Sequence, residues 1–309
     1  MTHQGHSART PAQRRSALRA RLARRGHTVV APGIYDGVSA RLADRQGFDA
    51  LYMTGYGVVA SLLGLPDAGI ATYGDMVNRV AQLATVTDTP LICDADTGYG
   101  GLLNVMHTVR GYEAAGAAAL QLEDQEAPKK CGHMLGRRVI EAADMAAKVR
   151  VAVETRNDPD LLVIARTDAR TSLGLDEAMR RAERYARAGA DVLFVEGTES
   201  AEEIRTLCRH FDLPMVVNLV EGGRGPMLTL DELRELGVGL ALQPVAALLA
   251  AAQAAESIYE GIRATGSSHT LPTPRYDFGS FSQRMGFDWV GEFDARHARL
   301  MKDDTDGGA

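Results

Sequence analysis

Eight short apolar runs, most of them followed by a segment with helical spacing, constrain the fold of this 309-residue chain more than any other feature. The runs are almost continuously apolar, as strands of a parallel sheet are when both faces are buried. Eight strand–helix units in about 230 residues predict an α/β fold, a (β/α)8 TIM-type barrel, with extra helices after the last run. The runs cover residues 28–34, 50–55, 90–94, 118–123, 161–166, 192–196, 214–219 and 239–243.

The main alternative is a doubly wound open sheet, which would carry a G-x-G-x-x-G sequence after its first strand. No such sequence follows residues 28–34, and the glycine-rich residues 98–101 follow the third run without the required spacing. The barrel is therefore favoured. We expect mobile tails at residues 1–10 and 301–309, and a single barrel domain over 11–300 that includes the C-terminal helical segment.

Composition restricts the partners. A net charge of −6 and a pI near 5.8 argue against nucleic acid. Three widely spaced cysteines predict no disulfide framework and fit a reducing, cytoplasmic setting. We expect no secretory signal, because the first residues lack an apolar stretch. No membrane contact is expected either, because the most apolar region, residues 240–255, is interrupted by Gln243, Pro244 and Gln253.

A helix is predicted from Pro11 to about Arg25, with Thr10 as its cap and with arginines around most of its surface. Because no aromatic residues are interleaved with the arginines, we interpret this face as solvated or in contact with another subunit, rather than as a nucleic-acid or membrane patch.

Polar residues cluster where the apolar runs end. Since active sites of such barrels lie at the carboxyl ends of the strands, six polar ends in succession predict an active site there. The polar ends are residues 52–57, 94–98, 123–125 and 166–168, Glu196 and Asn218.

The third and fourth ends suggest a metal site. Asp94 and Asp96 are two residues apart, so on an extended strand their side chains would point the same way. Together with Glu123 they would form an anionic, oxygen-rich pocket that suits Mg²⁺, with Mn²⁺ as a substitute. The histidines show no zinc-ligand spacing with the cysteines.

Arg166 and Asn218 are candidate anchors for an anionic substrate, the arginine through bidentate contacts to a carboxylate. Two structural interpretations remain open. Glu196 could pair with Arg166 instead of contacting substrate, and Asn218 could cap a loop.

The stretch 122–138 reads LEDQEAPKKCGHMLGRR. It begins with the carboxylates at 123 and 124, and the loop after them holds a single cysteine, Cys131. A cysteine beside two lysines and a histidine lies in an electropositive setting, which favours the thiolate. An activatable thiol would thus stand next to the predicted metal site.

With these motifs in order, residues 28–300 resemble the isocitrate lyase / phosphoenolpyruvate mutase superfamily, in its methylisocitrate lyase, dimethylmalate lyase and carboxyphosphonoenolpyruvate mutase branch. The resemblance implies an α/β barrel, Mg²⁺ chelated by a 2-hydroxy or 2-oxo acid, and a homotetramer of paired subunits that exchange a C-terminal helix. The motifs are residues 52–57 with 61–67, D-A-D-T-G-Y-G at 94–100, E-D-Q at 123–125, K-K-C-G-H at 129–133, A-R-T-D at 165–168, Glu196 and Asn218.

The resemblance also implies roles for individual residues. Tyr52 would take the hydroxyl proton, and Cys131 would protonate the enolate carbon. The 129–136 loop would close over the site and exclude water. Lys129 and His133 of that loop would belong to the catalytic group, and the substrate would contact Thr54, Gly55, Tyr56, Gly132, Arg166, Glu196 and Asn218.

These roles predict a Mg²⁺-dependent carbon–carbon lyase that cleaves a 2-hydroxy di- or tricarboxylate, like a 2-alkylmalate or methylisocitrate, into a 2-oxo acid and a carboxylate through an enolate. The first alternative is a carboxyphosphonoenolpyruvate mutase, because residues 132–138 and 218–223 resemble that group too. An oxaloacetate hydrolase would have serine after the asparagine, where this chain has Leu219. A catalytically silent binding barrel is the remaining alternative.

The substrate's size is predicted from one helix start. Family members that cleave methylisocitrate have an arginine near the start of the helix after the eighth strand, and Leu249 aligns there. Leu249 and Leu219 would form an apolar wall, which cannot offset the desolvation of a third carboxylate. We therefore expect 2-alkylated or 2,3-dialkylated malates as substrates, unless Arg275 supplies the missing cation.

Overall fold

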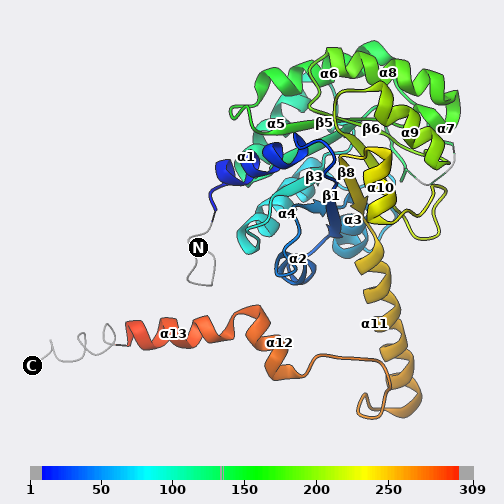
Figure 1. The fold of residues 1–309 in the computed structure, drawn as a ribbon. Helices are drawn as coiled ribbons and strands as arrows, with labels where there is room; N and C mark the ends of the chain where they lie inside the picture. The colour runs from blue at the N-terminus through cyan, green and yellow to red at the C-terminus, as the bar shows by residue number, and fades with distance from the viewer. Residues whose placement is uncertain (1–8, 133, 135, 299–309) are drawn as a thin grey trace, which may run out of the picture. The chain divides into compact units, whose positions relative to one another are not determined.

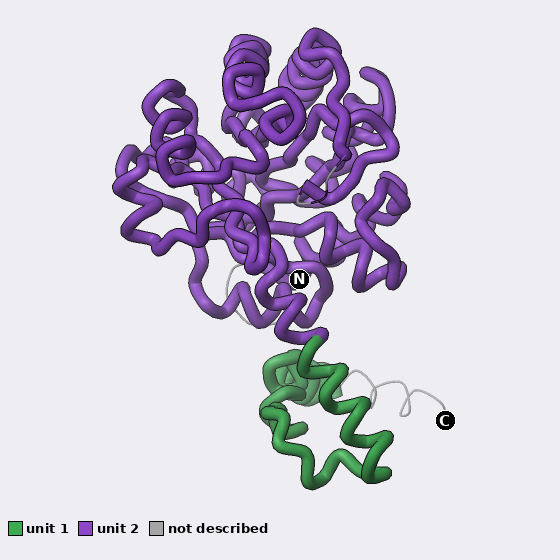
Figure 2. The backbone as a smooth tube through the Cα atoms, turned by 90° about the vertical axis from the view of Figure 1, so that its right-hand side faces the viewer, with its two compact units in different colours: residues 1–8, 253–309 green, residues 9–252 purple. Residues whose placement is uncertain are grey.

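The computed structural model describes residues 9–132, 134 and 136–298. Contacts divide the chain into two compact units, Arg9–Ala252 and a second unit made of residues 1–8 and 253–309 (Figure 2). The predicted mobile tails lie outside the described residues, apart from residues 9 and 10. The expectation of one domain over residues 11–300 stays a prediction.

The first unit is a closed barrel of eight parallel strands paired in chain order, each strand with the next and the last with the first (Figure 1). The predicted (β/α)8 fold is confirmed, and each apolar run corresponds to one strand, of which only β5 extends past its run, by one residue. The strands are β1 (Val29–Ile34), β2 (Leu51–Met53), β3 (Leu91–Asp94), β4 (Ala119–Glu123), β5 (Leu162–Thr167), β6 (Val192–Val195), β7 (Met215–Asn218) and β8 (Leu240–Gln243).

Helices surround the strands (Figure 1). Many begin with a side-chain cap of the kind that satisfies free backbone N–H groups. They are α2 (Gly37–Asp44), α3 (Gly55–Leu63), α4 (Tyr73–Val86), α5 (Leu102–Ala115), α6 (Ala142–Thr155), α7 (Ala169–Leu173), α8 (Leu175–Arg187), α9 (Ala201–His210), α10 (Leu230–Leu236) and α11 (Ala246–Thr265).

The strands bury both faces, which explains their unbroken apolar sequences. Side chains on one face, such as Ile92 and Phe194, fill the barrel interior. Those on the other face, such as Leu120 and Val163, pack against the surrounding helices. The strand ends are thereby fixed on two sides, and the residues that follow them are held in place.

The N-terminal helix α1 (Pro11–Leu22) covers the amino-terminal end of the barrel. The prediction of a solvated or intersubunit arginine face is wrong for its first two arginines, whereas the arginines at positions 24 and 25 are exposed. Leu18 and Leu22 join the core cluster of the barrel interior. Arg14 donates to the carbonyl of Ala84, and Arg15 donates to carbonyls near the end of α5. Both arginines are buried. They satisfy backbone oxygens that helix ends leave free.

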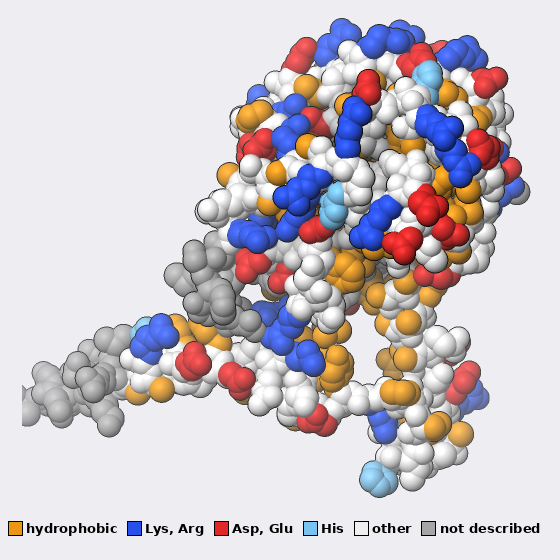
Figure 3. All heavy atoms as spheres, in the orientation of Figure 1, with side chains coloured by type: hydrophobic (Ala, Val, Ile, Leu, Met, Phe, Trp, Pro, Cys, Tyr) orange, Lys and Arg blue, Asp and Glu red, His pale blue; other side chains and the backbone are white. Residues whose placement is uncertain are grey.

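The second unit contains the rest of α11 with α12 (Phe278–Met285) and α13 (Phe287–His297). None of these three helices has a buried residue. Large apolar side chains are exposed on them, including Phe278 at 87% and Phe287 at 68%, and apolar atoms are visible along this unit in Figure 3. Exposure on this scale is typical of a surface that another chain covers.

Basic and acidic side chains are interspersed on the face of the barrel unit shown in Figure 3. In the part of the chain that the structure describes, no helix combines the length and the apolar character needed to cross a membrane.

Candidate active site

A cavity of about 290 Å³ opens at the carboxyl ends of the strands. Ten of the fifteen residues predicted for the site line it, namely Tyr52, Thr54, Tyr56, Asp94, Glu123, Lys129, Cys131, Gly132, Arg166 and Asn218. Gly55, Asp96 and Glu196 lie behind lining residues. His133 falls outside the described residues. Arg275 belongs to the second unit, where Nη1 donates to the carbonyl of Ser268, so its assignment to the site stays a prediction.

The turn after β3 differs from the prediction. The strand ends at Asp94, and Asp96 has a left-handed backbone with φ of 49°, so the two side chains are not related by the two-residue repeat of a strand. Oδ1 of Asp94 instead accepts a hydrogen bond from the backbone N–H of Asp96 at 3.0 Å. Both carboxyl groups are buried, but Asp94 lines the cavity and Asp96 does not.

Asp96 is held by Lys129. Nζ of Lys129 lies 2.6 Å from Oδ1 of Asp96 and 2.6 Å from Oδ1 of Asp67, and all three side chains are buried. Burial alone would lower the pKa of Lys129, but Asp96, Glu123 and the other nearby carboxylates raise it well above its ordinary value. Lys129 therefore remains a cation. Burial raises the pKa of Asp96 to about 6, against the opposing effect of Lys129.

Thr54 and Gly55 begin helix α3 beside the cavity. The Thr54 hydroxyl caps the helix by accepting from the N–H of Gly57 at 3.3 Å. A Cβ on Gly55 would collide with the carboxylate of Asp94, so only glycine lets the helix start this close to it. The helix thus directs its positive N-terminal end towards the carboxylate side of the site.

Arg166, from β5, is surrounded by carboxylate groups. Its Nε and Nη2 form a bidentate pair with Asp168, and Nη1 lies 3.7 Å from Oε2 of Glu196. Its Nε also lies 3.4 Å from Oε2 of Glu123. The predicted bidentate contact is therefore made to the protein's own Asp168.

Glu196 and Asn218 contact each other, since Nδ2 of Asn218 donates to Oε2 of Glu196 at 3.2 Å. Glu196 thus pairs with Arg166 and Asn218, which agrees with the interpretation that Glu196 is a partner of Arg166. Oδ1 of Asn218 has no hydrogen-bond partner among the described residues, and Asn218 lines the cavity.

Tyr52 stands on the cavity floor, with its hydroxyl donating to Oε1 of Gln121 at 3.4 Å. Burial raises the pKa of Tyr52 well above its ordinary value, and the charge of Asp94 adds to the rise. The phenol is therefore protonated at neutral pH.

The segment 126–138 brings Cys131 and Gly132 to the cavity. Gln125 clamps the backbone of Lys130, accepting from its N–H and donating to its carbonyl at 2.9 Å each. The N–H of Cys131 donates to the carbonyl of Asp67 at 3.1 Å. A Cβ on Gly132 would collide with Arg166 and Glu196, so the segment lies directly against the site.

One side of the cavity is apolar. Val220, Pro244, Val245 and Leu249 line it. Leu249 thus lies at the cavity, and its predicted effect on the choice of substrate stays a prediction. The predicted role of Leu219 is wrong. Its side chain is 1% exposed and packs in a core cluster behind the strands with residues such as Leu233.

Several cavity residues were given no role from the sequence: Asp67, Lys130, Met134, Val220, Glu221, Pro244 and Val245. Asp67 and Lys130 stood inside motifs, so a signal existed for them. The apolar residues had none, because a valine that ends at a cavity looks the same in sequence as one that ends in the core.

The charges of the site do not balance. Among the described residues, seven buried carboxyl groups surround the carboxyl ends of the strands with four buried cations. Oε1 of Glu123 has no hydrogen-bond partner among those residues, and burial raises the pKa of Glu123 well above its ordinary value. The carboxyl groups are Asp67, Asp94, Asp96, Glu123, Asp124, Asp168 and Glu196, and the cations are Lys129, Arg137, Arg166 and Arg181.

This donor set fits a magnesium ion. No three acidic, histidine or cysteine groups within the described ranges are arranged to hold an ion by themselves. Mg²⁺ does not need such a cage, because it keeps waters and substrate oxygens and uses one or two carboxylates. An unpaired carboxylate oxygen and an excess of negative charge are what such an ion would satisfy.

Comparison with known proteins shows the family. Residues 18–263 match the family model described as phosphoenolpyruvate phosphomutase. The chain is 42% identical to 2,3-dimethylmalate lyase of Eubacterium barkeri over 87% of this chain and 93% of that one. It is 38% identical to 2-methylisocitrate lyase of Aeropyrum pernix over 96% and 95%. It is also 38% identical to the chloroplastic carboxyvinyl-carboxyphosphonate phosphorylmutase of Arabidopsis thaliana over 88% and 81%.

Solved structures agree. A crystal structure of 2,3-dimethylmalate lyase superposes with a TM-score of 0.87 at 36% identity, covering 93% of this chain and 95% of that one. Oxaloacetate acetylhydrolase with 3,3-difluorooxalacetate gives 0.84 at 35% identity, over 97% and 99%. Phosphonopyruvate hydrolase with oxalate and Mg²⁺ gives 0.84 at 29% identity, over 94% and 100%. These matches span nearly the whole chain, and the chain belongs to the phosphoenolpyruvate mutase / isocitrate lyase superfamily.

Proposed function

We propose that this protein is a Mg²⁺-dependent carbon–carbon lyase that cleaves a 2-hydroxydicarboxylate with alkyl substituents. The products would be a 2-oxo acid and a carboxylate. The observation that carries the proposal is the composition of one cavity, in which unbalanced carboxylates, Arg166 and Cys131 stand opposite an apolar wall. The relatives named as lyases of dimethylmalate and methylisocitrate support it.

Asp94 and Glu123 are the cavity-lining carboxylates that would hold the metal, with Asp96 beside them on Lys129. A bound Mg²⁺ would polarise the substrate's 2-hydroxyl and carboxylate oxygens as a Lewis acid. The support from a relative is a solved phosphonopyruvate hydrolase that contains Mg²⁺ and oxalate. Mn²⁺ offers the same ligand preferences.

The chain's own groups would move the protons. Tyr52 takes the proton of the 2-hydroxyl, the C2–C3 bond breaks, and its electron pair leaves on the departing carboxylate as an enolate. Cys131 then gives its proton to the enolate carbon. Because burial and Asp94 hold the Tyr52 phenol protonated, Tyr52 can serve as the base only after it has lost its own proton, and the positive charge of a bound Mg²⁺ would favour that loss.

Lys129 keeps Asp96 and Asp67 in place. Arg166 presents positive charge to the substrate's carboxylate. The amide oxygen of Asn218, which has no hydrogen-bond partner among the described residues, would accept a hydrogen bond from a substrate hydroxyl. His133, implied as a member of this group, lies outside the described residues. Three further residues line the cavity and would contact the substrate: Thr54, Tyr56 and Gly132.

The apolar wall decides the substrate class. Val220, Val245 and Leu249 offer no partner for a third carboxylate, and the rim residue Glu221 would repel one. Alkyl substituents at C2 and C3 fit this surface. We therefore propose 2-alkyl- or 2,3-dialkylmalates over isocitrate and methylisocitrate.

Assembly is proposed from the second unit. Its helices bury none of their described side chains and expose large aromatic residues. A homotetramer of paired subunits that exchange this C-terminal segment would cover them, and multi-angle light scattering of the full chain would measure the mass.

A substrate panel tests the function. 2-Methylmalate, 2,3-dimethylmalate, isocitrate and methylisocitrate are incubated with Mg²⁺ or EDTA, and the 2-oxo acid is measured as its hydrazone. We expect release from the alkylmalates with Mg²⁺ only. Full activity in EDTA would rule out the metal, and no release from any malate would rule out the lyase.

Leu249→Arg tests the wall in the same panel. It should raise kcat/KM for methylisocitrate relative to dimethylmalate by roughly 10- to 100-fold, since a single group in a pocket is worth about 1–3 kcal/mol. Ala250→Arg, exposed on the same helix and outside the cavity, is the matched control. If wild type already cleaves methylisocitrate as well as the best malate, the preference is wrong and Arg275 becomes the next residue to change.

The second candidate is a phosphonomutase, which the 38% identity to carboxyvinyl-carboxyphosphonate phosphorylmutase favours. It predicts a new P–C bond in phosphorus NMR spectra with phosphonate substrates and no cleavage of malates. A silent binding barrel predicts neither reaction, and no rise in melting temperature with Mg²⁺ and oxalate.

A further inference from the structure

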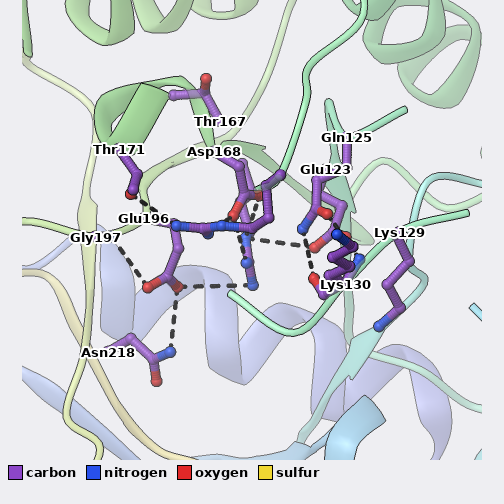
Figure 4. Close-up of polar contacts among 12 residues, drawn as sticks. Glu123, Gln125, Lys129, Lys130, Thr167, Asp168, Thr171, Glu196, Gly197 and Asn218 are labelled. Atoms are coloured by element: carbon purple, nitrogen blue, oxygen red, sulfur yellow. Dashed lines mark hydrogen bonds and ion pairs between the residues drawn. The ribbon is translucent and has the colours of Figure 1, made fainter. Parts of the chain in front are cut away.

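Asp168, which follows β5, is a fully buried carboxylate that joins two arginines from different parts of the site (Figure 4). Arg166 donates to it through Nε at 2.9 Å and Nη2 at 2.8 Å. Arg137, from the segment 126–138, donates through Nη1 to the same Oδ1 that accepts from Nη2 of Arg166. Asp168 itself does not line the cavity.

Arg137 fixes the far end of the segment that carries Cys131. Its Nη2 donates to Oγ1 of Thr171 at 2.7 Å, so both ends of its guanidinium are bound to residues that follow β5. The near end of the segment is held separately, by Lys129 on Asp67 and Asp96 and by Gln125 on Lys130. Arg137 is thus the link between the segment and the strand that presents Arg166.

Asp168 is itself held from behind by Asp124. The carboxylate of Asp124 accepts from the N–H of Asp168 at 2.9 Å, from Thr167 at 2.7 Å and from Tyr185 at 2.7 Å. Arg181 of α8 donates to it at 3.1 Å. Four bonds to one buried carboxylate leave Asp168 little freedom to move.

Arg166 has competing partners if Asp168 releases it. Oε2 of Glu123 and Oε2 of Glu196 lie 3.4 Å and 3.7 Å from its nitrogens. Turning towards either would change the direction in which positive charge meets the substrate, and would move Nη2, against which Gly132 is packed. The position of Arg166 and the position of the segment are therefore not independent.

We propose that Asp168 is a positioning residue that couples the orientation of Arg166 to the seating of the Cys131 segment through Arg137. The inference rests on the proposed function for its catalytic meaning and extends it to residues outside the cavity. Arg137 and Asp168 contact no substrate. They act by holding the guanidinium of Arg166 in the orientation that binds the anion while the thiol of Cys131 is held in the position from which it donates its proton.

The coupling is measured first without substrate, through alkylation of Cys131 by iodoacetamide in a Cys208→Ser background, since Cys93 is fully buried. Asp168→Asn and Arg137→Met should each speed alkylation by roughly 10-fold, within the usual range of coupling between sites. Arg138→Met is the matched control, because Arg138 is exposed and pairs only with Glu126 in the described contacts. Equal rates in Arg137→Met and wild type would overturn the proposal.

Binding of oxalate with Mg²⁺, measured by calorimetry, gives the second readout. Arg137→Met should raise the oxalate Kd by roughly 10-fold although Arg137 does not touch the cavity, and Arg137→Lys should restore most of the affinity. The double variant Asp168→Asn/Arg137→Met should bind no worse than Asp168→Asn alone, because both changes break one linkage.

The outcomes separate the two proposals. Fully additive losses in the double variant would overturn the coupling. Absence of oxalate binding by wild type would overturn the proposed function, while the alkylation rates would still decide the coupling. A variant that melts well below wild type is replaced by Arg137→Lys, in which alkylation must stay close to the wild-type rate for the coupling to stand.

Discussion

The two ends of the barrel both bury charged side chains, but they leave those charges in different states. At the amino-terminal end, each arginine of α1 that is buried reaches a backbone carbonyl or an acidic side chain, as Arg15 does with Ala117 and Asp158. At the carboxyl end, buried carboxylates outnumber buried cations, and Oε1 of Glu123 has no partner among the described residues.

The difference in how the buried charges are paired distinguishes an end that serves the fold from an end suited to binding. A buried polar group with all its bonds made contributes to a stable, specific fold. A buried carboxylate without a partner lowers stability, and such groups persist where a ligand or ion completes them. The buried arginines of α1 therefore need no further partner, whereas the carboxyl end has the charge composition of a site that binds a cation.

Two cysteines, one at each end, give the largest expected contrast. Cys131 lines the candidate cavity at the carboxyl end, and Cys208 lines a depression at the amino-terminal end, where burial raises its pKa to about 11. Cys131→Ser should lower kcat on the order of 10²- to 10⁴-fold, the usual scale for a positioned acid, while oxalate still binds. Steady-state kinetics on the best alkylmalate gives the measurement.

Cys208→Ser is the matched control and should keep most of the activity. Equal losses from both substitutions, accompanied by equal drops in melting temperature, would mean that the effect is on folding and that the ends do not differ in the way described.

The sequence was sufficient for the barrel, and the candidate cavity opens at the end where the sequence predicted a site. Strands buried on both faces have unbroken apolar sequences, and polar residues such as Asp94 and Asn218 mark where those strands stop. It was not sufficient for local geometry. Asp96 was placed on a strand that ends two residues earlier. Leu219 was placed at the cavity, although its side chain is buried in the core cluster between the strands and the outer helices.

Long-range partners were beyond the sequence as well. Arg15 bonds to the carbonyl of Ala117, 102 residues away, and nothing in a local run of arginines indicates a backbone oxygen as partner. Asp168 stood in a recognised motif without a role, because its second partner, Arg137, comes from another part of the chain. Such pairings become visible only when the fold has brought the residues together.

Arg15→Met should show the second largest effect and test the amino-terminal end. The change removes donors from the buried carbonyls of Ala117 and Glu113 and from Asp158. Unsatisfied buried acceptors should lower the free energy of unfolding by about 3 kcal/mol. Urea titration measures the loss, and kcat under native conditions should stay at the wild-type value.

Arg25→Met is its control, because the Arg25 side chain is 91% exposed and its pair with Asp212 is 3.5 Å long. Exposed pairs of this kind contribute little, so stability should change by no more than about 0.5 kcal/mol. If Arg15→Met instead lowered kcat without loss of stability, the amino-terminal end would have a part in the chemistry.

The smallest effect is a pH dependence of opposite sign at the two ends, measured by urea unfolding in EDTA. Burial raises the pKa of Asp96 to about 6 in the folded protein, so between about pH 4 and 6 the folded state binds more protons than the unfolded one. The contribution of Asp96 to the free energy of unfolding should therefore fall as the pH rises through this window, on the order of 2 kcal/mol. Asp96→Asn should remove that fall and leave a flatter profile.

At the other end, burial raises the pKa of Asp158, but the N–H of Asp160 and Arg15 outweigh it and the pKa is lowered. Its stabilising contribution is present above the ordinary aspartate pKa and is lost as the pH falls through the lowered value, so Asp158→Asn should reduce stability near neutral pH and have less effect in acid. Profiles that shift in the same direction for both variants would show that the carboxylates at the carboxyl end are as well satisfied as those that contact the arginines of α1.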